Sequence, residues 1–149
     1  MGTHYKGSKK EMRALDSYIK LMRAADTINS AFNLSLSKFG LTESQFNVLD
    51  ALYHIGPLSQ KKLGYKLLKS GGNITMIIDN IEKDAYVERK RGTEDRRIFF
   101  IHLTNKGGKK IKDILPVQVN FITNEMNRLS KTEQIELQRL CKKIGIRKQ

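Results

Sequence analysis

The sequence predicts a mainly α-helical protein with one small β-hairpin, and three observations support this fold class. Apolar residues recur every three or four positions over most of the 149 residues, which is the spacing of one face of an α-helix. Two of these segments begin with Ser or Thr followed three residues later by Glu or Gln, the pattern of a helix capping box. Within residues 86–103 the pattern changes to short strands around a charged turn.

The region before residue 86 predicts four helices. After about ten residues that are expected to form a loose tail, helical spacing predicts one long helix over about 11–38. Thr42 is expected to cap a second helix, and Ser59 a short third one. A fourth helix over about 70–85 carries one apolar stripe, which consists of Ile74, Ile77, Ile78 and Ile81.

The rest of the sequence predicts the hairpin and two further helices. Two strands within 86–103 are joined by a polar turn at 91–96. Thr104 is expected to cap a long helix, and a capping box that starts at Ser130 begins the last one.

Three short helices followed by a hairpin is the order of a winged helix-turn-helix. In that fold one helix enters the major groove of DNA, and the hairpin reaches the backbone or the minor groove. We therefore expect a single domain over 1–149, with the winged helix-turn-helix at about 41–104. Helices at about 11–38 and 105–145 flank it, and their apolar stripes exceed what so small a unit can cover. These flanking helices are therefore expected to need a partner that covers their stripes.

The charge of the chain favours a polyanionic partner. Lys and Arg number 28 and Asp and Glu number 15, which gives a net charge of +13. Nucleic acid is the first expected partner and an anionic membrane surface the second. No apolar run is long enough to cross a bilayer, and the apolar stripe of the basic last helix is better used in a dimer. The single cysteine leaves no internal disulfide framework, so a reducing cytoplasm is the expected location.

The polar side of the 70–85 helix is the first candidate DNA-reading surface. Asn can pair with adenine through two hydrogen bonds, and Thr can contact a thymine methyl group or a phosphate. Asp79 on this side would repel phosphate unless a cation pairs with it. A solvated face of an ordinary amphipathic helix is the alternative. The predicted DNA contacts of this helix are Ser70, Asn73, Thr75, Met76 and Asn80.

The tip of the hairpin is the second candidate. Between Arg89 and Arg97 five cations fall within nine residues. In an extended segment Asp95 and Arg97 would lie on one face, where the carboxylate can hold the guanidinium in position. An oriented arginine suits a narrow minor groove with its strong negative potential, whereas a charged turn that only adds solubility is the alternative. The predicted DNA contacts of the tip are Arg91, Asp95, Arg96 and Arg97.

Several of these stretches resemble MarR-family transcriptional regulators. Residues 70–75, 78–83 and 87–89 are similar to that family's recognition helix and first wing strand. Asp95-Arg96-Arg97, followed by Leu103-Thr104 and Gly107, resembles its wing signature, and the segment from Leu129 to Ile144 resembles its C-terminal dimerisation helix. The resemblance spans roughly 11–145.

This resemblance implies a homodimeric transcription factor, usually a repressor, that binds a near-palindromic operator on double-stranded DNA. It implies that Arg97 enters the minor groove and that Asp95 orients it. In many members of the family a small effector, often phenolic, binds between the dimerisation and DNA-binding regions and releases the DNA. No pocket residue of this chain can be assigned from the sequence.

Other functions find less support. No catalytic site, cofactor or metal site is expected: the serines have no paired His and carboxylate, no phosphate-binding loop is present, and His4, His54 and His102 lack metal-ligand spacing. Cys141 lies in register with the apolar stripe of the last helix, which favours a buried or interface cysteine over an oxidant sensor. The main competing function is a non-specific architectural DNA-binding protein, which would use the same basic surface without reading bases.

Overall fold

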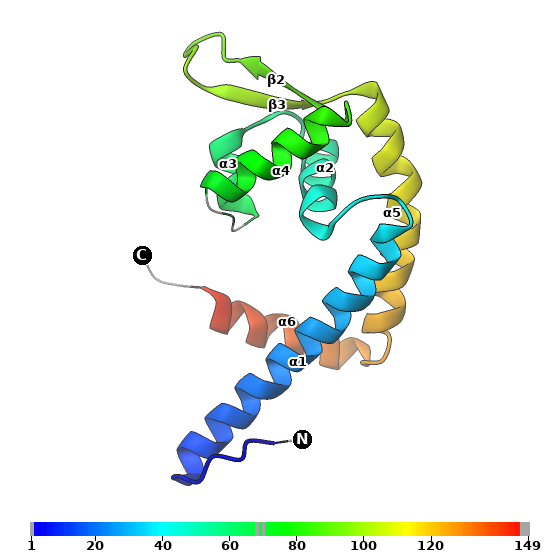
Figure 1. Ribbon diagram of the computed structural model, residues 1–149. Helices are drawn as coiled ribbons and strands as arrows, with labels where there is room; N and C mark the ends of the chain where they lie inside the picture. Colours follow the sequence, from blue (N-terminus) through cyan, green and yellow to red (C-terminus); the bar gives the residue numbers. More distant parts are fainter. Residues whose placement is uncertain (1, 68, 70, 147–149) are drawn as a thin grey trace.

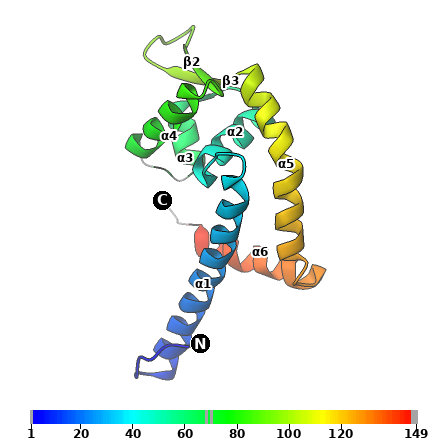
Figure 2. The same cartoon turned by 45° about the vertical axis from the view of Figure 1, so that its right-hand side comes forward.

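The computed structural model describes residues 2–67, 69 and 71–146, and its architecture is the expected one of helices with a small antiparallel sheet. Helices α2, α3 and α4 gather with the sheet at one end of the molecule (Figure 1). Helices α1 and α5 extend away from that end, and α6 follows α5 at the far side, as the turned view in Figure 2 also shows. The predicted fold class, mainly α with a β-hairpin wing, is therefore confirmed.

Helix α1 (Lys9–Ser37) begins earlier than expected. The Ser8 amide donates to the Glu11 carboxylate at 2.8 Å, and the Ser8 hydroxyl in turn accepts from the Glu11 amide. This reciprocal capping box satisfies amides that a helix start leaves free. The Ser8 hydroxyl, which also donates to the Glu11 carboxylate at 2.8 Å, and then the Ser8 amide lower the pKa of the Glu11 carboxyl. The expectation of a loose tail over the first ten residues was therefore wrong. The Thr3 amide also donates to the Asp16 carboxylate of α1, which holds the start of the chain against this helix.

The next elements are α2 (Glu43–Ile55), β1 (Leu58–Ser59), α3 (Gln60–Lys66) and α4 (Gly71–Lys83). The Thr42 and Ser59 hydroxyls cap α2 and α3 as expected. The two-residue strand β1 was not expected, because so short an element carries no periodicity of its own. It exists through pairing with a distant strand, in which Leu58 faces Ile101.

The wing consists of β2 (Val87–Arg91) and β3 (Phe99–Leu103), which pair antiparallel. The strand order of the three-stranded sheet is β1-β3-β2, so the predicted two-stranded hairpin gains a third strand at the edge of β3. The hairpin tip is also longer than predicted, because the second strand begins at Phe99 rather than at residue 97.

The chain ends with α5 (Asn105–Met126) and α6 (Lys131–Gly145). The Thr104 hydroxyl caps α5, and the expected capping box of Ser130 and Glu133 begins α6. No residue of α6 is buried in the chain. Cys141 is consequently exposed, which corrects the expectation of a cysteine buried within the chain. Its place at an interface stays a prediction.

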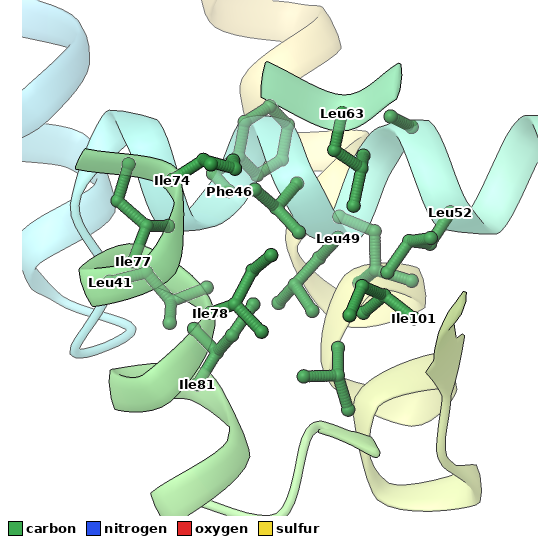
Figure 3. Close-up of a cluster of buried hydrophobic side chains, with 14 of the residues drawn as sticks. Leu41, Phe46, Leu49, Leu52, Leu63, Ile74, Ile77, Ile78, Ile81 and Ile101 are labelled. Atoms are coloured by element: carbon green, nitrogen blue, oxygen red, sulfur yellow. The ribbon is translucent and has the colours of Figure 1, made fainter. Parts of the chain in front are cut away.

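The hydrophobic core lies under the winged end of the molecule. The four isoleucines of α4 point inward, where they meet side chains of α2, α3 and β3 (Figure 3). Burying one such side chain fully contributes about 1.5–3 kcal/mol relative to leaving it exposed. The buried apolar residues are Phe32, Leu36, Leu41, Phe46, Val48, Leu49, Ala51, Leu52, Leu63, Ile74, Ile77, Ile78, Ile81, Val87, Ile101, Ile111 and Ile114.

The turn between α4 and β2 is fixed on the start of α5. The Thr104 hydroxyl donates to the Ala85 carbonyl oxygen at 2.6 Å, and the Lys106 ammonium lies 5.0 Å from the centre of the Tyr86 ring. Gly107 packs so closely here that a Cβ atom would collide with the Tyr86 carbonyl oxygen. This junction sets where α5 leaves the winged end.

Candidate nucleic-acid interface

Helix α4 presents a polar face to solvent because its isoleucines face the core. Asn73, Thr75, Met76 and Asn80 are all exposed, and Met76 is 58% accessible. The fifth residue predicted on this helix, Ser70, lies outside the described residues. On the helical wheel Met76 lies opposite the apolar stripe, and Asn73, Thr75 and Asn80 lie on the flanks of that polar face, which is the face that a helix entering a groove would turn to DNA.

The Thr75 hydroxyl already has partners inside the protein. It donates to the Gly71 carbonyl oxygen at 2.9 Å and accepts from Gln60 Nε2 at 2.6 Å. A phosphate contact through this hydroxyl would compete with those bonds. The methyl group has no such constraint, and it is the part of Thr75 suited to a thymine methyl contact.

A groove between the start of α2 and α4 adds residues that the sequence analysis missed. It has a volume of about 380 Å³, and its lining includes Ser44 and Lys69 together with Asn73, Met76 and Asn80. Ser44 and Lys69 stand in no motif: Lys69 lies two residues before α4, and the packing of α2 against α4 brings Ser44 beside the predicted contacts. The groove therefore places a hydroxyl and an ammonium next to the amides of α4.

Asp79 has the cationic partner that a DNA-facing position requires. Arg89 Nη2 lies 2.6 Å from Asp79 Oδ1, and Arg89 Nη1 lies 2.8 Å from Glu82 Oε1. The side chain of Arg89 is only 19% exposed. The sequence position of Arg89 suggested a cation of the wing tip. The structure corrects this, because the Arg89 guanidinium lies against α4.

The wing tip holds Arg97 against Asp95. Asp95 Oδ1 accepts from the Arg97 amide at 3.0 Å and from Arg97 Nε at 3.2 Å. The bonds from Arg97 lower the pKa of the Asp95 carboxyl, the backbone bond most strongly. The expected geometry was wrong in one respect: the pair forms in a turn rather than an extended segment, and the Ile98 amide closes that turn on the Asp95 carbonyl oxygen.

The side chain of Arg97 is nevertheless 91% exposed. Asp95 anchors the backbone and one edge of the guanidinium, while the rest of the side chain projects into solvent. An arginine that is both charged and pre-oriented loses little conformational freedom when it binds.

The remaining cations of the tip differ in their surroundings. Arg91 Nη1 donates to the Arg96 carbonyl oxygen at 3.1 Å, and the Arg91 guanidinium lies 5.0 Å from the centre of the Phe99 ring. Lys90 pairs with Glu88 at 3.0 Å. Arg96 is exposed on the turn itself. Arg91, Arg96 and Arg97 thus form the cationic surface of the wing, and Arg89 and Lys90 are paired with acids on the strand side.

The described part of the chain holds neither a cluster of metal-ligating side chains nor a membrane-spanning helix. Among those residues no group of three or more His, Cys, Asp or Glu side chains is close enough to hold a metal ion. His54 instead lies 3.0 Å from the Asp50 carboxylate one turn earlier on α2. None of the described helices is both long enough and apolar enough to cross a membrane.

Comparison with known proteins shows the same architecture in transcriptional regulators. Residues 30–114 match the family model described as transcriptional regulator SarA/Rot. The chain is 33% identical over 134 residues to the HTH-type transcriptional regulator MhqR of Bacillus subtilis. This match covers 90% of this chain and 92% of MhqR. It is also 31% identical over 114 residues to the transcriptional repressor MprA of Escherichia coli, in a match that covers 75% of this chain and 65% of MprA.

The backbone is also similar to a solved protein–DNA complex. The match is to Sco3205 of Streptomyces coelicolor, a MarR family transcriptional regulator whose structure was determined with DNA. The TM-score is 0.86 at 17% sequence identity, and the match covers 95% of this chain and 90% of that chain. At this identity the likeness shows a shared fold.

Proposed function

This chain belongs to the SarA/Rot family of MarR-type winged-helix transcriptional regulators, and from that premise we propose that it is a repressor that reads a near-palindromic operator as a homodimer. DNA binding is the activity of the family. The proposal adds sequence specificity, the dimer and repression, and it names the residues that carry the first two.

The observation that carries the proposal is the geometry of Arg97. Its side chain is 91% exposed, and its position on the wing is fixed by Asp95. The negative potential of a narrow minor groove favours such a cation. Asn73, Thr75, Met76 and Asn80 are then the contacts to base edges in the major groove, and Arg91 and Arg96 contact phosphate. For Ser70 the same proposal rests on the sequence alone.

Exposed apolar side chains on the flanking helices support the homodimer. Monomeric proteins rarely leave such stripes open. A dimer with two-fold symmetry would set two recognition helices about 34 Å apart, one turn of DNA, which is the reason for a near-palindromic operator. The apolar residues concerned are Met12, Leu15, Tyr18, Leu21 and Met22 of α1, Val117, Val119 and Ile122 of α5, and Ile135, Leu137, Leu140 and Ile144 of α6.

Regulation by a small phenolic or other aromatic effector is the further part of the proposal, and it rests on the resemblance to MarR-family regulators. A dimer bound across a promoter would exclude RNA polymerase, and an effector that favours the unbound state would restore transcription. A protein with this task acts in the cytoplasm, where the DNA is, and needs neither catalysis nor a cofactor.

The test is fluorescence anisotropy with duplex DNA from upstream of the protein's own gene and a scrambled duplex, at one near-physiological salt concentration. We expect the upstream duplex to bind tighter by a factor on the order of a thousand or more. Arg97→Ala should weaken that binding by about ten- to a hundredfold, with an unchanged circular dichroism spectrum. Arg128→Ala removes the same charge near the α5–α6 turn, where Arg128 pairs with Glu125 at 3.4 Å, and is the matched control.

Non-specific architectural binding is the competing function, and the net charge of +13 favours it. It predicts equal affinity for upstream, scrambled and all selected genomic duplexes, with a salt dependence of about −0.9 per phosphate neutralised. Arg97→Ala would then weaken binding to the upstream and scrambled duplexes by the same factor. A genomic fragment that binds selectively would instead identify an operator away from the protein's own gene.

A further inference from the structure

We propose that Arg89 is a positioning residue for DNA binding, which neutralises the acids of the DNA-facing helix and fixes the wing to that helix. The inference rests on the proposed DNA-binding function. It concerns a residue that does not itself touch DNA, because its guanidinium lies between β2 and α4.

The geometry shows one guanidinium shared by two carboxylates. Asp79 and Glu82 stand one turn apart on α4, and Arg89 reaches them from the middle of β2. Nη2 lies 2.6 Å from Asp79 and Nη1 lies 2.8 Å from Glu82, whose second oxygen accepts from the Arg89 amide at 2.9 Å. Backbone and side chain of Arg89 are both engaged, so the strand and the helix are held in one relative position.

A further contact extends this cluster to the surface that faces DNA. Arg89 Nε donates to Gln60 Oε1 at 3.5 Å, and Gln60 Nε2 donates to the Thr75 hydroxyl at 2.6 Å. Helix α3, helix α4 and strand β2 are thereby joined through one set of side chains. A shift of the wing would therefore also change the position of the Thr75 side chain, which is one of those proposed to contact bases.

The charges give Arg89 its second role. Without it, the exposed side of α4 would carry the acids Asp79 and Glu82 against the single cation Lys83. The Asp79 side chain is 58% exposed while Arg89 is 19% exposed. The carboxylate thus faces outward and the cation that compensates it lies behind it. Unpaired, Asp79 would repel the phosphates that flank the groove.

Arginine suits this place better than lysine does. Its planar fork offers several donors in a fixed geometry, whereas an ammonium is a single compact charge. Arg89→Lys would keep the net charge and lose the simultaneous contacts with Asp79 and Glu82. We expect it to weaken DNA binding by a few-fold, less than a neutral side chain does.

The test separates the charge of Arg89 from its packing by restoring neutrality at Asp79. Arg89→Met should weaken binding to a random-sequence duplex at low salt by about tenfold, because it leaves the Asp79 carboxylate without its cation beside the phosphates. Adding Asp79→Asn to Arg89→Met should return the affinity to within about threefold of wild type. Arg128→Met makes the same change of charge at another ion-paired arginine and should leave the affinity within twofold.

The random-sequence duplex makes the outcomes distinct. If wild-type protein binds neither this duplex nor the upstream one, the proposed function fails. If wild type binds and folded Arg89→Met binds equally well, or if Asp79→Asn restores nothing while circular dichroism shows both variants folded, the role of Arg89 is overturned. Should Arg89→Met not fold, the same pair of measurements is made on Arg89→Lys with and without Asp79→Asn, where partial loss and recovery are again expected and their absence overturns the proposal.

Discussion

The centre and the ends of this chain differ in how they bury apolar side chains. Every buried apolar residue in the described part of the chain lies between Phe32 and Ile114. The first two-thirds of α1 and the whole of α6 bury none, although their apolar residues also recur at helical spacing. The segment matched by the SarA/Rot family model, residues 30–114, is nearly the same as the one that builds the core.

The periodicity of apolar residues in a sequence thus indicates which face of a helix is apolar, but it does not indicate what covers that face. In α4 the isoleucines are covered by α2, α3 and the sheet of the same chain (Figure 3). In α6 the equivalent stripe extends into solvent within one chain. The centre therefore covers its own apolar faces, whereas the ends leave theirs exposed, as the proposed homodimer requires.

Breaking the proposed dimer should have the largest effect. Leu140→Glu combined with Ile144→Glu places two charges on the apolar stripe of α6, and an isologous interface contains each of them twice. Burying an unpaired charge costs several kcal/mol, so the dissociation constant of the dimer should rise on the order of a thousandfold or more. Analytical ultracentrifugation measures it directly.

The chain itself should remain folded in that variant, because Leu140 and Ile144 are 42% and 58% exposed. Gln138→Glu adds a charge on another side of α6 and should leave the dimer intact. A double variant that sediments as wild type does would show that the ends serve some purpose other than dimerisation.

A smaller effect is expected at the junction that joins the centre to α5. Gly107→Ala should lower the free energy of unfolding by about 1–3 kcal/mol, because its Cβ would collide with the Tyr86 carbonyl oxygen. Gly108→Ala has only a Leu103 methyl group at 3.9 Å and should raise the same quantity by about 0.5–1 kcal/mol through helix propensity. Urea denaturation of the two variants gives the comparison, and equal stabilisation by both would contradict the close packing of this junction.

The smallest effect concerns the wing tip and its dependence on pH. The bonds from Arg97 hold the pKa of the Asp95 carboxyl below its ordinary value of 3.8. A lowered folded-state pKa means that the contact is fully present above the ordinary value and is lost only as the pH falls through the lowered one. This pair should therefore cause no change in DNA affinity over about pH 6–8.

A carbon-detected NMR titration of Asp95 tests that statement. Arg97→Ala should raise the pKa only part of the way, because the backbone amide, which has the larger effect, remains. An Asp95 pKa at or above 3.8 in the wild-type protein would show that the tip does not hold Arg97 in solution.

The parts of the fold that depend on local chemistry could be predicted from the sequence. The caps at Thr42, Ser59, Thr104 and Ser130 are all present, because a hydroxyl three residues before a free amide is a local arrangement. The capping box at Ser8 is equally local, but the polar composition around it suggested a tail. Composition was the weaker guide there, since Glu11 completes the pattern.

The parts that depend on distant contacts could not be predicted. Strand β1 exists only through its pairing with β3, and Gln60 enters the Arg89 cluster from another helix. Asp79 gave one indication, because an acid on a DNA-facing helix requires a cation, yet the sequence did not say which of many cations it was. The outward position of Cys141 has the same cause, since no segment among the described residues of its own chain covers α6.

The most direct test of the central claim is the stoichiometry of the complex between wild-type protein and its preferred duplex, measured by native mass spectrometry. If the centre reads DNA and the ends pair two copies, each duplex takes two chains, and Leu140→Glu with Ile144→Glu loses both the second chain and most of the sequence preference. A complex of one chain per duplex with undiminished preference would contradict the claim.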